Sequence, residues 1–142
     1  MKNEALIVAG EQLRDKAENL IRSLRAAELE RQRYVDFFER SLDAQLITDQ
    51  QGTIQEGNPA ASRLLAVDRR FLPGKPLVAF ARNEDSRLLY QALDVLRRER
   101  TVDLELTFVS RKAKATRVAL RGARMSEELL YVWFASPTEP AD

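Results

Sequence analysis

Residues 47–65, with the sequence ITDQQGTIQEGNPAASRLL, contain the signals for a strand, a tight turn, a second strand and a capped helix. Gly52 ends a polar turn sequence and supplies the positive φ that a tight hairpin requires. Asn58 precedes Pro59, and an Asn side chain can accept hydrogen bonds from the free amides of the first helical turn, where proline also fits. The stretch therefore predicts a hairpin over residues 44–55 that leads into a short helix, with Asn58 as its structural cap.

The composition excludes most catalytic and metal chemistries. The chain has 142 residues, 44% of them apolar, which suffices for one domain with a core plus an accessory element. It contains no cysteine and no histidine, so it lacks disulfides, thiolate nucleophiles, thiolate metal ligands and the commonest general base. Neighbouring acidic residues fit helix caps and loops rather than a general acid and base pair. We therefore expect neither an enzyme nor a metal site.

The charges do not indicate a nucleic-acid or membrane partner. The net charge is +1, from 23 basic and 22 acidic residues, without the one-sign field of a nucleic-acid binder. A basic cluster of Arg111, Lys112, Lys114 and Arg117 has no interleaved aromatic residues, so we interpret it as a solvated turn. The apolar run at residues 5–9 is too short for a signal peptide, and no later stretch approaches ~20 apolar residues. A cytoplasmic protein is expected.

Residues 1–41 are predicted to form one long amphipathic helix that dimerises as a coiled coil. Between residues 3 and 41 there is no proline and one glycine, Gly10, and strong helix formers dominate. Such a helix is roughly 55 to 60 Å long, too long for one small domain to cover. Packing of the helix on its own domain is the alternative, since Gly10 and Arg31 interrupt the heptad pattern. The predicted dimer seam consists of Leu6, Leu13, Ala17, Leu20, Leu24, Ala27, Tyr34 and Phe38.

Residues 42–135 are predicted to form an α+β domain, a five-stranded antiparallel sheet with short helices on one face. After the first hairpin, helical turns are expected near residues 60–66 and 77–81, followed by a longer helix that Asn83 caps. Two strands joined by a hairpin loop at 111–113 then follow. Opposite charges are expected to pair across one face of these strands, between Asp103 or Glu105 and Arg117 or Arg121.

The last predicted strand, LLYVWFA at residues 129–135, is apolar on both faces. An antiparallel strand covered on both sides is central in its sheet, so one face must meet the short helices and the other another cover. The long helix or a second copy of it is available, and the seam is expected to continue onto the sheet near Tyr131 or Trp133. The tail at residues 136–142 is polar, contains two prolines and is expected to be disordered.

This order of elements resembles the PAS family of sensor domains over residues 35–135. The stretch ITDQQGTIQEGNPAASRLL is similar to the family's opening, in which a strand ending in Asp, a Gly turn and an Asn followed by Ala-Ala lead into the first helix. The family's Asn corresponds to Asn58, and its small residues to Ala60 and Ala61. One departure is the sequence RKAKAT at residues 111–116, which lacks the glycine of the family's frequent Lys-Asp-Gly turn.

The resemblance implies a pocket for a small ligand or cofactor between the helices and the sheet. Cysteine adducts of flavin or of a coumaroyl chromophore and haem held by histidine are excluded because neither residue type is present, and the cofactor stays unknown. The same side chains fit a simple packed core, and both interpretations stay open. The predicted lining is Leu46, Thr48, Leu64, Leu65, Phe71, Leu77, Phe80, Leu88, Leu89, Phe108, Val118, Leu120 and either Tyr131 or Trp133.

The resemblance also implies signalling through helices and protein contacts. We expect a cytoplasmic sensory or regulatory module that forms a homodimer and acts on a downstream signalling protein or a fused effector domain. The family's usual Asp-Ile-Thr exit is missing, so we expect either a fragment of a larger regulator or a signal that leaves by the front helix or a protein contact. A constitutive dimerisation scaffold without ligand is the alternative.

Overall fold

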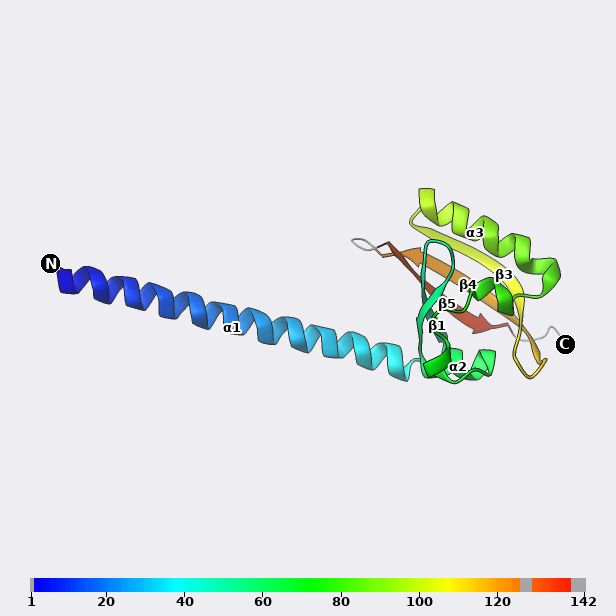
Figure 1. Cartoon of the computed structure of the whole chain (residues 1–142), viewed down its shortest axis with the longest axis horizontal. Helices are drawn as coiled ribbons and strands as arrows, with labels where there is room; N and C mark the ends of the chain where they lie inside the picture. Colours follow the sequence, from blue (N-terminus) through cyan, green and yellow to red (C-terminus); the bar gives the residue numbers. More distant parts are fainter. Residues whose placement is uncertain (1, 126–128, 139–142) are drawn as a thin grey trace. The chain divides into compact units, whose positions relative to one another are not determined.

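The computed structural model describes residues 2–125 and 129–138, and it divides into two compact units, Met1–Phe37 and Phe38–Asp142. The first unit is a single helix, α1 (Lys2–Arg40), whose last turn belongs to the second unit (Figure 1). The prediction of one long amino-terminal helix is confirmed. Ala, Leu, Glu and Arg dominate it, and its proline-free sequence allows it to continue for 39 residues.

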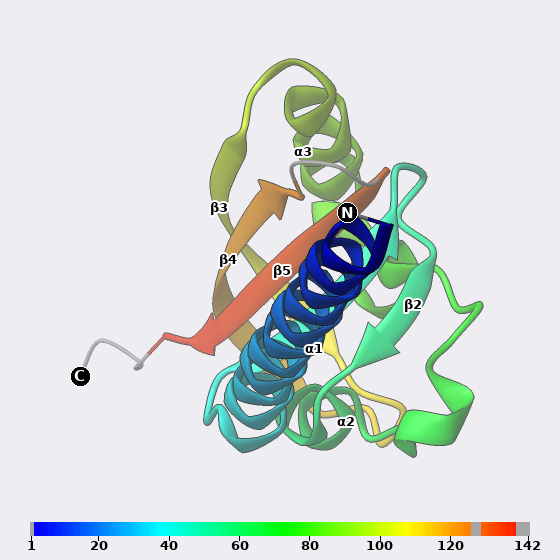
Figure 2. The same ribbon diagram turned by 90° about the vertical axis from the view of Figure 1, so that its left-hand side faces the viewer.

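The second unit is built on a five-stranded sheet in which all neighbouring strands are antiparallel (Figure 2). The spatial order is β2-β1-β5-β4-β3, so the apolar last strand is central, as predicted. The strands are β1 (Ala44–Asp49), β2 (Ile54–Gly57), β3 (Thr101–Val109), β4 (Ala115–Arg124) and β5 (Leu130–Pro137). The predicted α+β fold with a five-stranded antiparallel sheet is confirmed.

The last strand is longer than predicted. β5 continues two residues past the expected boundary at 135, because Ser136 pairs with Ala119 and Pro137 with Val118 in β4. These residues were expected in a disordered tail, and for them that prediction is wrong. The remainder of the predicted tail from residue 139 lies outside the described residues.

Short helices pack against one face of the sheet, which we call the inner face; the opposite side is the outer face. The helices are α2 (Pro59–Leu65), η1 (Arg69–Phe71), η2 (Leu77–Phe80), η3 (Asn83–Asp85) and α3 (Ser86–Arg98). Asn83 does not cap the long helix as predicted, because it begins the separate turn η3. Two hydrogen bonds to the Thr107 backbone explain the difference: the Arg82 amide donates to the Thr107 carbonyl, and the Asp85 carboxylate accepts from the Thr107 amide at 2.8 Å.

The two hairpin turns use different residues for a left-handed backbone. Gly52, at φ +86°, closes the first turn as predicted, and the Asp49 carboxylate accepts hydrogen bonds from the Gln51 and Thr53 amides. In the second hairpin Ala113, which is not a glycine, adopts φ +61°. Ser110 stabilises this loop, because its hydroxyl oxygen accepts from two loop amides at 3.2 Å.

Candidate functional site

The inner face brings most of the predicted lining residues together in one buried core. Leu64 is partly buried at its margin. The buried members are Leu46, Thr48, Leu65, Leu77, Phe80, Leu89, Phe108, Val118, Leu120, Tyr131 and Trp133. Both of the alternatives Tyr131 and Trp133 therefore point inward.

Two predicted lining residues do not reach this core. Phe71 is 59% exposed and lies under the guanidinium of Arg70, 5.5 Å from the ring centroid. Leu88 is 39% exposed, because the buried stripe of α3 begins one residue later, at Leu89. Both predictions are wrong: an apolar side chain at the end of a short turn or beside a helical stripe can stay at the surface.

Two polar side chains in the core satisfy each other. The Trp133 indole N–H donates to the Thr48 hydroxyl at 2.8 Å, and that hydroxyl donates to the Asp49 carbonyl at 2.9 Å. Both side chains are fully buried. Hydrogen bonding fixes the indole on β5 against β1, so Thr48 has a structural partner rather than a free group for a ligand.

The Tyr131 hydroxyl is the exception in this core. Its ring meets Trp133 edge-on, with centroids 6.4 Å apart and planes at 78°. The side chain is fully buried, yet its oxygen is a side-chain polar atom without a hydrogen-bond partner in the described part of the chain. Because a buried unpaired hydroxyl costs about 1–3 kcal/mol, this oxygen is the point at which the core would gain most from a polar ligand.

Packing around the indole leaves little room. A Cβ on Gly122 in β4 would lie 2.7 Å from the six-membered ring of Trp133. The neighbouring strand therefore approaches the indole as closely as a glycine allows. Surface hollows lie elsewhere: one of about 550 Å³ is formed by η2, η3 and the end of β3.

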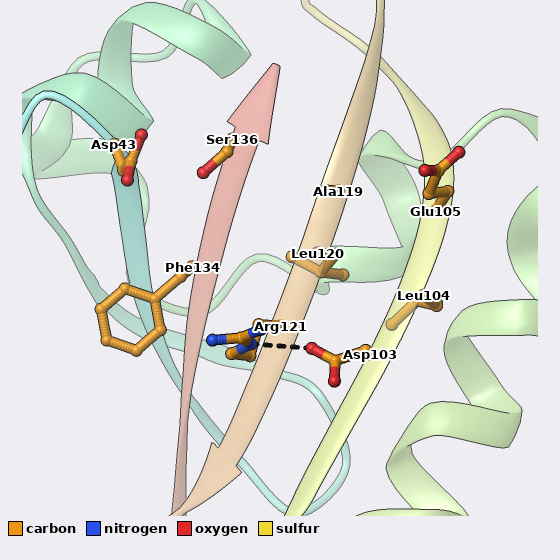
Figure 3. Close-up of a pocket in the computed structure, with 9 residues that line it drawn as sticks. All are labelled: Asp43, Asp103, Leu104, Glu105, Ala119, Leu120, Arg121, Phe134 and Ser136. Atoms are coloured by element: carbon orange, nitrogen blue, oxygen red, sulfur yellow. Dashed lines mark hydrogen bonds and ion pairs between the residues drawn. The ribbon is translucent and has the colours of Figure 1, made fainter. Parts of the chain in front are cut away.

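Another hollow, about 780 Å³ in volume, lies on the outer face of the sheet (Figure 3). Arg121 of β4 and Asp103 of β3 pair across it at 2.8 Å, and the Phe134 ring extends from β5 beside them. This confirms the predicted charge pairing, which Arg117 and Glu105 extend at 3.8 Å. The complete lining is Asp43, Asp103, Leu104, Glu105, Ala119, Leu120, Arg121, Phe134 and Ser136.

The outer face also carries apolar side chains that the chain leaves partly exposed. Leu130, Val132 and Phe134 of β5 alternate with the buried Tyr131 and Trp133 and are half-buried. Tyr131 and Trp133, near which the sequence predicts that the dimer seam continues, face the core and are buried. The available outer surface is the one around Val132 and Phe134.

The side chains of the predicted dimer seam are exposed along α1, with the exception of Phe38 at its end. Leu13 is 68% exposed and Leu20 and Leu24 are 61% exposed. The exposed seam side chains are Leu6, Leu13, Ala17, Leu20, Leu24, Ala27 and Tyr34, and Phe38, in the second unit, is half-buried.

Asn58 caps α2 as predicted and also binds two other segments. Its Oδ1 accepts from the Ala61 amide, which is the helix cap, and from the Gln45 amide of β1, both at 2.9 Å. Its Nδ2 donates to the carbonyls of Phe38 at 2.9 Å and Asp43 at 3.0 Å. The additional contacts span up to 20 residues, so the local cap signal in the sequence could not reveal them.

A second contact that the sequence did not predict joins the end of α1 to η1. The two terminal guanidinium nitrogens of Arg69 bind the two carboxylate oxygens of Glu39 at 2.5 and 2.7 Å. These hydrogen bonds hold the pKa of Glu39 below its ordinary value because they favour the charged form. The pKa of Arg69 is raised, also chiefly by its hydrogen bonds to Glu39.

Within residues 2–125 and 129–138, no group of three or more acidic side chains is arranged to hold a metal ion. In the same part of the chain, no helix combines the length and the apolar character needed to cross a membrane.

Comparisons with known proteins identify the fold. The family model described as PAS fold matches residues 32–134. The PAS domain of an HTR-like protein from Haloarcula marismortui has a TM-score of 0.70 at 20% identity, over 82% of this chain and 98% of that chain. A domain of a sensory box sensor histidine kinase/response regulator from Geobacter sulfurreducens has a TM-score of 0.69 at 19% identity, over 77% and 95%.

A third solved structure contains a small molecule. It is a PAS domain in complex with ethanol, from a LuxR-family transcriptional regulator of Burkholderia thailandensis, with a TM-score of 0.61 at 12% identity, over 73% of this chain and 96% of that chain. At these identities the likeness establishes the fold. A search of curated proteins finds no match.

Proposed function

Because the chain belongs to the PAS family, we propose that it is a cytoplasmic sensory or regulatory module that forms a homodimer and relays a signal through α1. One observation carries the proposal: the residues that the structure describes leave two apolar surfaces incompletely covered, the exposed α1 seam and the half-buried outer face around Phe134. Exposed apolar surface of this kind marks an interaction site. The similar domain from a Geobacter sensor histidine kinase/response regulator supports a downstream or fused effector as the further partner.

A second copy of the chain fits both surfaces. Residues 19–27 of α1 combine Leu20 and Leu24 with two arginines and contain no acidic residue. The outer hollow contributes Asp43, Asp103 and Glu105. Arg121 pairs with Asp103 and Arg117 with Glu105, so Asp43 is the acidic side chain of the lining outside these two pairs. Apolar contact favours this helix segment of one protomer against the same segment or the outer face of the other protomer. Charge favours the outer face, because two copies of the basic segment repel each other and Asp43 attracts it.

Replacing Leu20 and Leu24 together by Asp tests the dimer. Four charges then lie in the seam of a dimer, where desolvation and repulsion outweigh the apolar contact. We expect a folded monomer by analytical ultracentrifugation at micromolar concentration, with an unchanged circular dichroism spectrum.

The matched control is Asn19→Asp with Ala26→Asp, which adds two charges at exposed positions of the same helix that lie off the seam. This control should stay dimeric. If the Leu20 and Leu24 variant stays dimeric too, α1 does not hold the dimer and transmission along it is excluded.

A small ligand in the core is the second part of the proposal. The unpaired Tyr131 hydroxyl supports it, and the surrounding apolar side chains favour a small uncharged molecule with one hydrogen-bonding group. The Burkholderia PAS domain in complex with ethanol has a ligand of that kind.

The close packing of Gly122 on Trp133 favours the alternative function, a constitutive dimerisation scaffold without ligand. Native mass spectrometry of the purified chain separates the two. A bound small molecule supports the sensor, whereas a repeatedly empty protein from several expression hosts supports the scaffold.

A further inference from the structure

Arg69 lies between two carboxylates that belong to different parts of the fold. Its Nη2 is 2.7 Å from Oε1 of Glu39 in the last turn of α1. The same nitrogen is 3.9 Å from Oε1 of Glu56 in the edge strand β2. Glu39 has a two-bond fork with Arg69, and Glu56 has a single long contact.

The backbone of Arg69 is held in place independently of these side chains. Asp68 caps η1 by accepting from the Arg70 amide at 3.0 Å. The Arg69 carbonyl accepts from the Leu72 amide at 3.3 Å. A change of partner therefore requires rotation of the Arg69 side chain and no movement of η1.

The other attachment of the helix end has a different character. Asn58 is fully buried and holds the Phe38 carbonyl at 2.9 Å. The Arg69 and Glu39 side chains are 37% and 34% exposed, and Glu56 is 55% exposed. Because partly exposed ion pairs are weak and buried hydrogen bonds are costly to break, the ion pair is the releasable contact and Asn58 the permanent one.

We propose that Arg69 is a two-position switch at the junction of α1 with the sheet domain. In the closed position Arg69 makes two hydrogen bonds to Glu39 and fixes the last turn of α1, residues 38–40. In the open position it binds Glu56, and that turn is held by Asn58 alone and frays. The guanidinium keeps a carboxylate partner in both positions, so the exchange leaves no unpaired charge on Arg69 and a bias from either side shifts the equilibrium.

The switch would regulate the relay and in that respect rests on the proposed function. A movement of α1 that pulls Glu39 away passes to η1 and β2 as a change of partner for Arg69. A change in the core that shifts β2 acts in the reverse direction, because coupling between two sites is reciprocal.

Two isosteric variants distinguish a switch from a fixed clip, by which we mean an Arg69 that binds Glu39 permanently and never exchanges partners. Glu39→Gln and Glu56→Gln each remove one negative charge next to the same arginine, so a general electrostatic role predicts effects of the same sign. The switch predicts opposite signs. Amide hydrogen exchange of Phe38, Glu39 and Arg40, measured by NMR on the full chain, should become about two- to fivefold faster in Glu39→Gln, the size expected for a partly exposed ion pair.

In Glu56→Gln the same amides should exchange more slowly than in the wild type, because the open position has lost its acceptor. Asp103→Asn is the matched control, since it breaks the exposed pair with Arg121 on the outer face and should leave these amides unchanged. Unchanged exchange in Glu56→Gln makes Arg69 a fixed clip and overturns the switch. Unchanged or slower exchange in Glu39→Gln overturns it as well.

The measurement is independent of the dimer. Repeating it in the Leu20→Asp and Leu24→Asp background reports on the junction within a single chain. Opposite shifts that persist there support the switch whether or not the wild-type chain dimerises. A wild-type chain that is itself monomeric would remove only the proposed relay. If the wild-type chain is a dimer and the amides of residues 38–40 respond to neither Gln variant, the proposed dimer stands and the switch is overturned.

Discussion

The two faces of β5 differ in how deeply their apolar side chains are buried. On the inner face Tyr131, Trp133 and Ala135 are fully buried under the helices. On the outer face Val132 and Phe134 are equally apolar and only half-buried. A strand that needed a single buried face would alternate with polar residues, so the apolar surplus on the outer face supports the proposed contact with a second copy of the chain.

Trp133→Ala should have the largest effect on the inner face. The indole is fully buried, so its loss should lower the free energy of unfolding by about 3–5 kcal/mol, the usual range for deleting a large core side chain. Urea denaturation followed by circular dichroism measures the change. A loss below about 1 kcal/mol would mean that the inner face is loosely packed, and the distinction between the faces would fail.

Thr48→Val tests the polar contact of the inner face at nearly constant shape. Valine removes the hydroxyl that accepts from the Trp133 indole N–H at 2.8 Å and leaves that donor buried without a partner. We expect a loss of about 1–3 kcal/mol in unfolding free energy, smaller than that of Trp133→Ala, measured in the same urea series. A neutral result would show that the indole finds another acceptor.

Local sequence signals predicted the elements of this fold better than the contacts between them. Gly52 and the Asn58-Pro59 pair act within a few residues, so their turn and cap were predicted correctly. The distinction between Leu88 and Leu89 depends on the orientation of α3 on the sheet, which helical periodicity leaves uncertain by one residue.

The junction contacts were beyond the reach of sequence reasoning for a different reason. Glu39 and Arg69 are 30 residues apart, and both belong to segments rich in charged residues where many pairings are equally plausible. Asn58 carried a clear local signal, yet its contact with the Phe38 carbonyl requires the whole hairpin to be in place. The same holds for β5. Its run of apolar residues does not reveal that Tyr131 and Trp133 face the core while Val132 and Phe134 face outward, because that depends on the packing of the sheet.

Phe134→Ala should have the smallest effect on the stability of the chain itself and completes the comparison. The ring extends into the outer hollow beside Arg121 and Asp103 (Figure 3), so its removal from a monomer should change the unfolding free energy by roughly 1 kcal/mol or less. The Leu20→Asp and Leu24→Asp background provides that monomer for urea denaturation.

In the otherwise wild-type chain the same Phe134→Ala substitution should weaken dimerisation, because an aromatic anchor at the centre of an interface contributes strongly to affinity. Sedimentation equilibrium measures this effect as an increased dissociation constant. A loss in the monomer as large as that of Trp133→Ala would place Phe134 in the core of the single chain. An unchanged dissociation constant would mean that the outer face is not part of the dimer, and the apolar surplus on β5 would then have to serve a different protein.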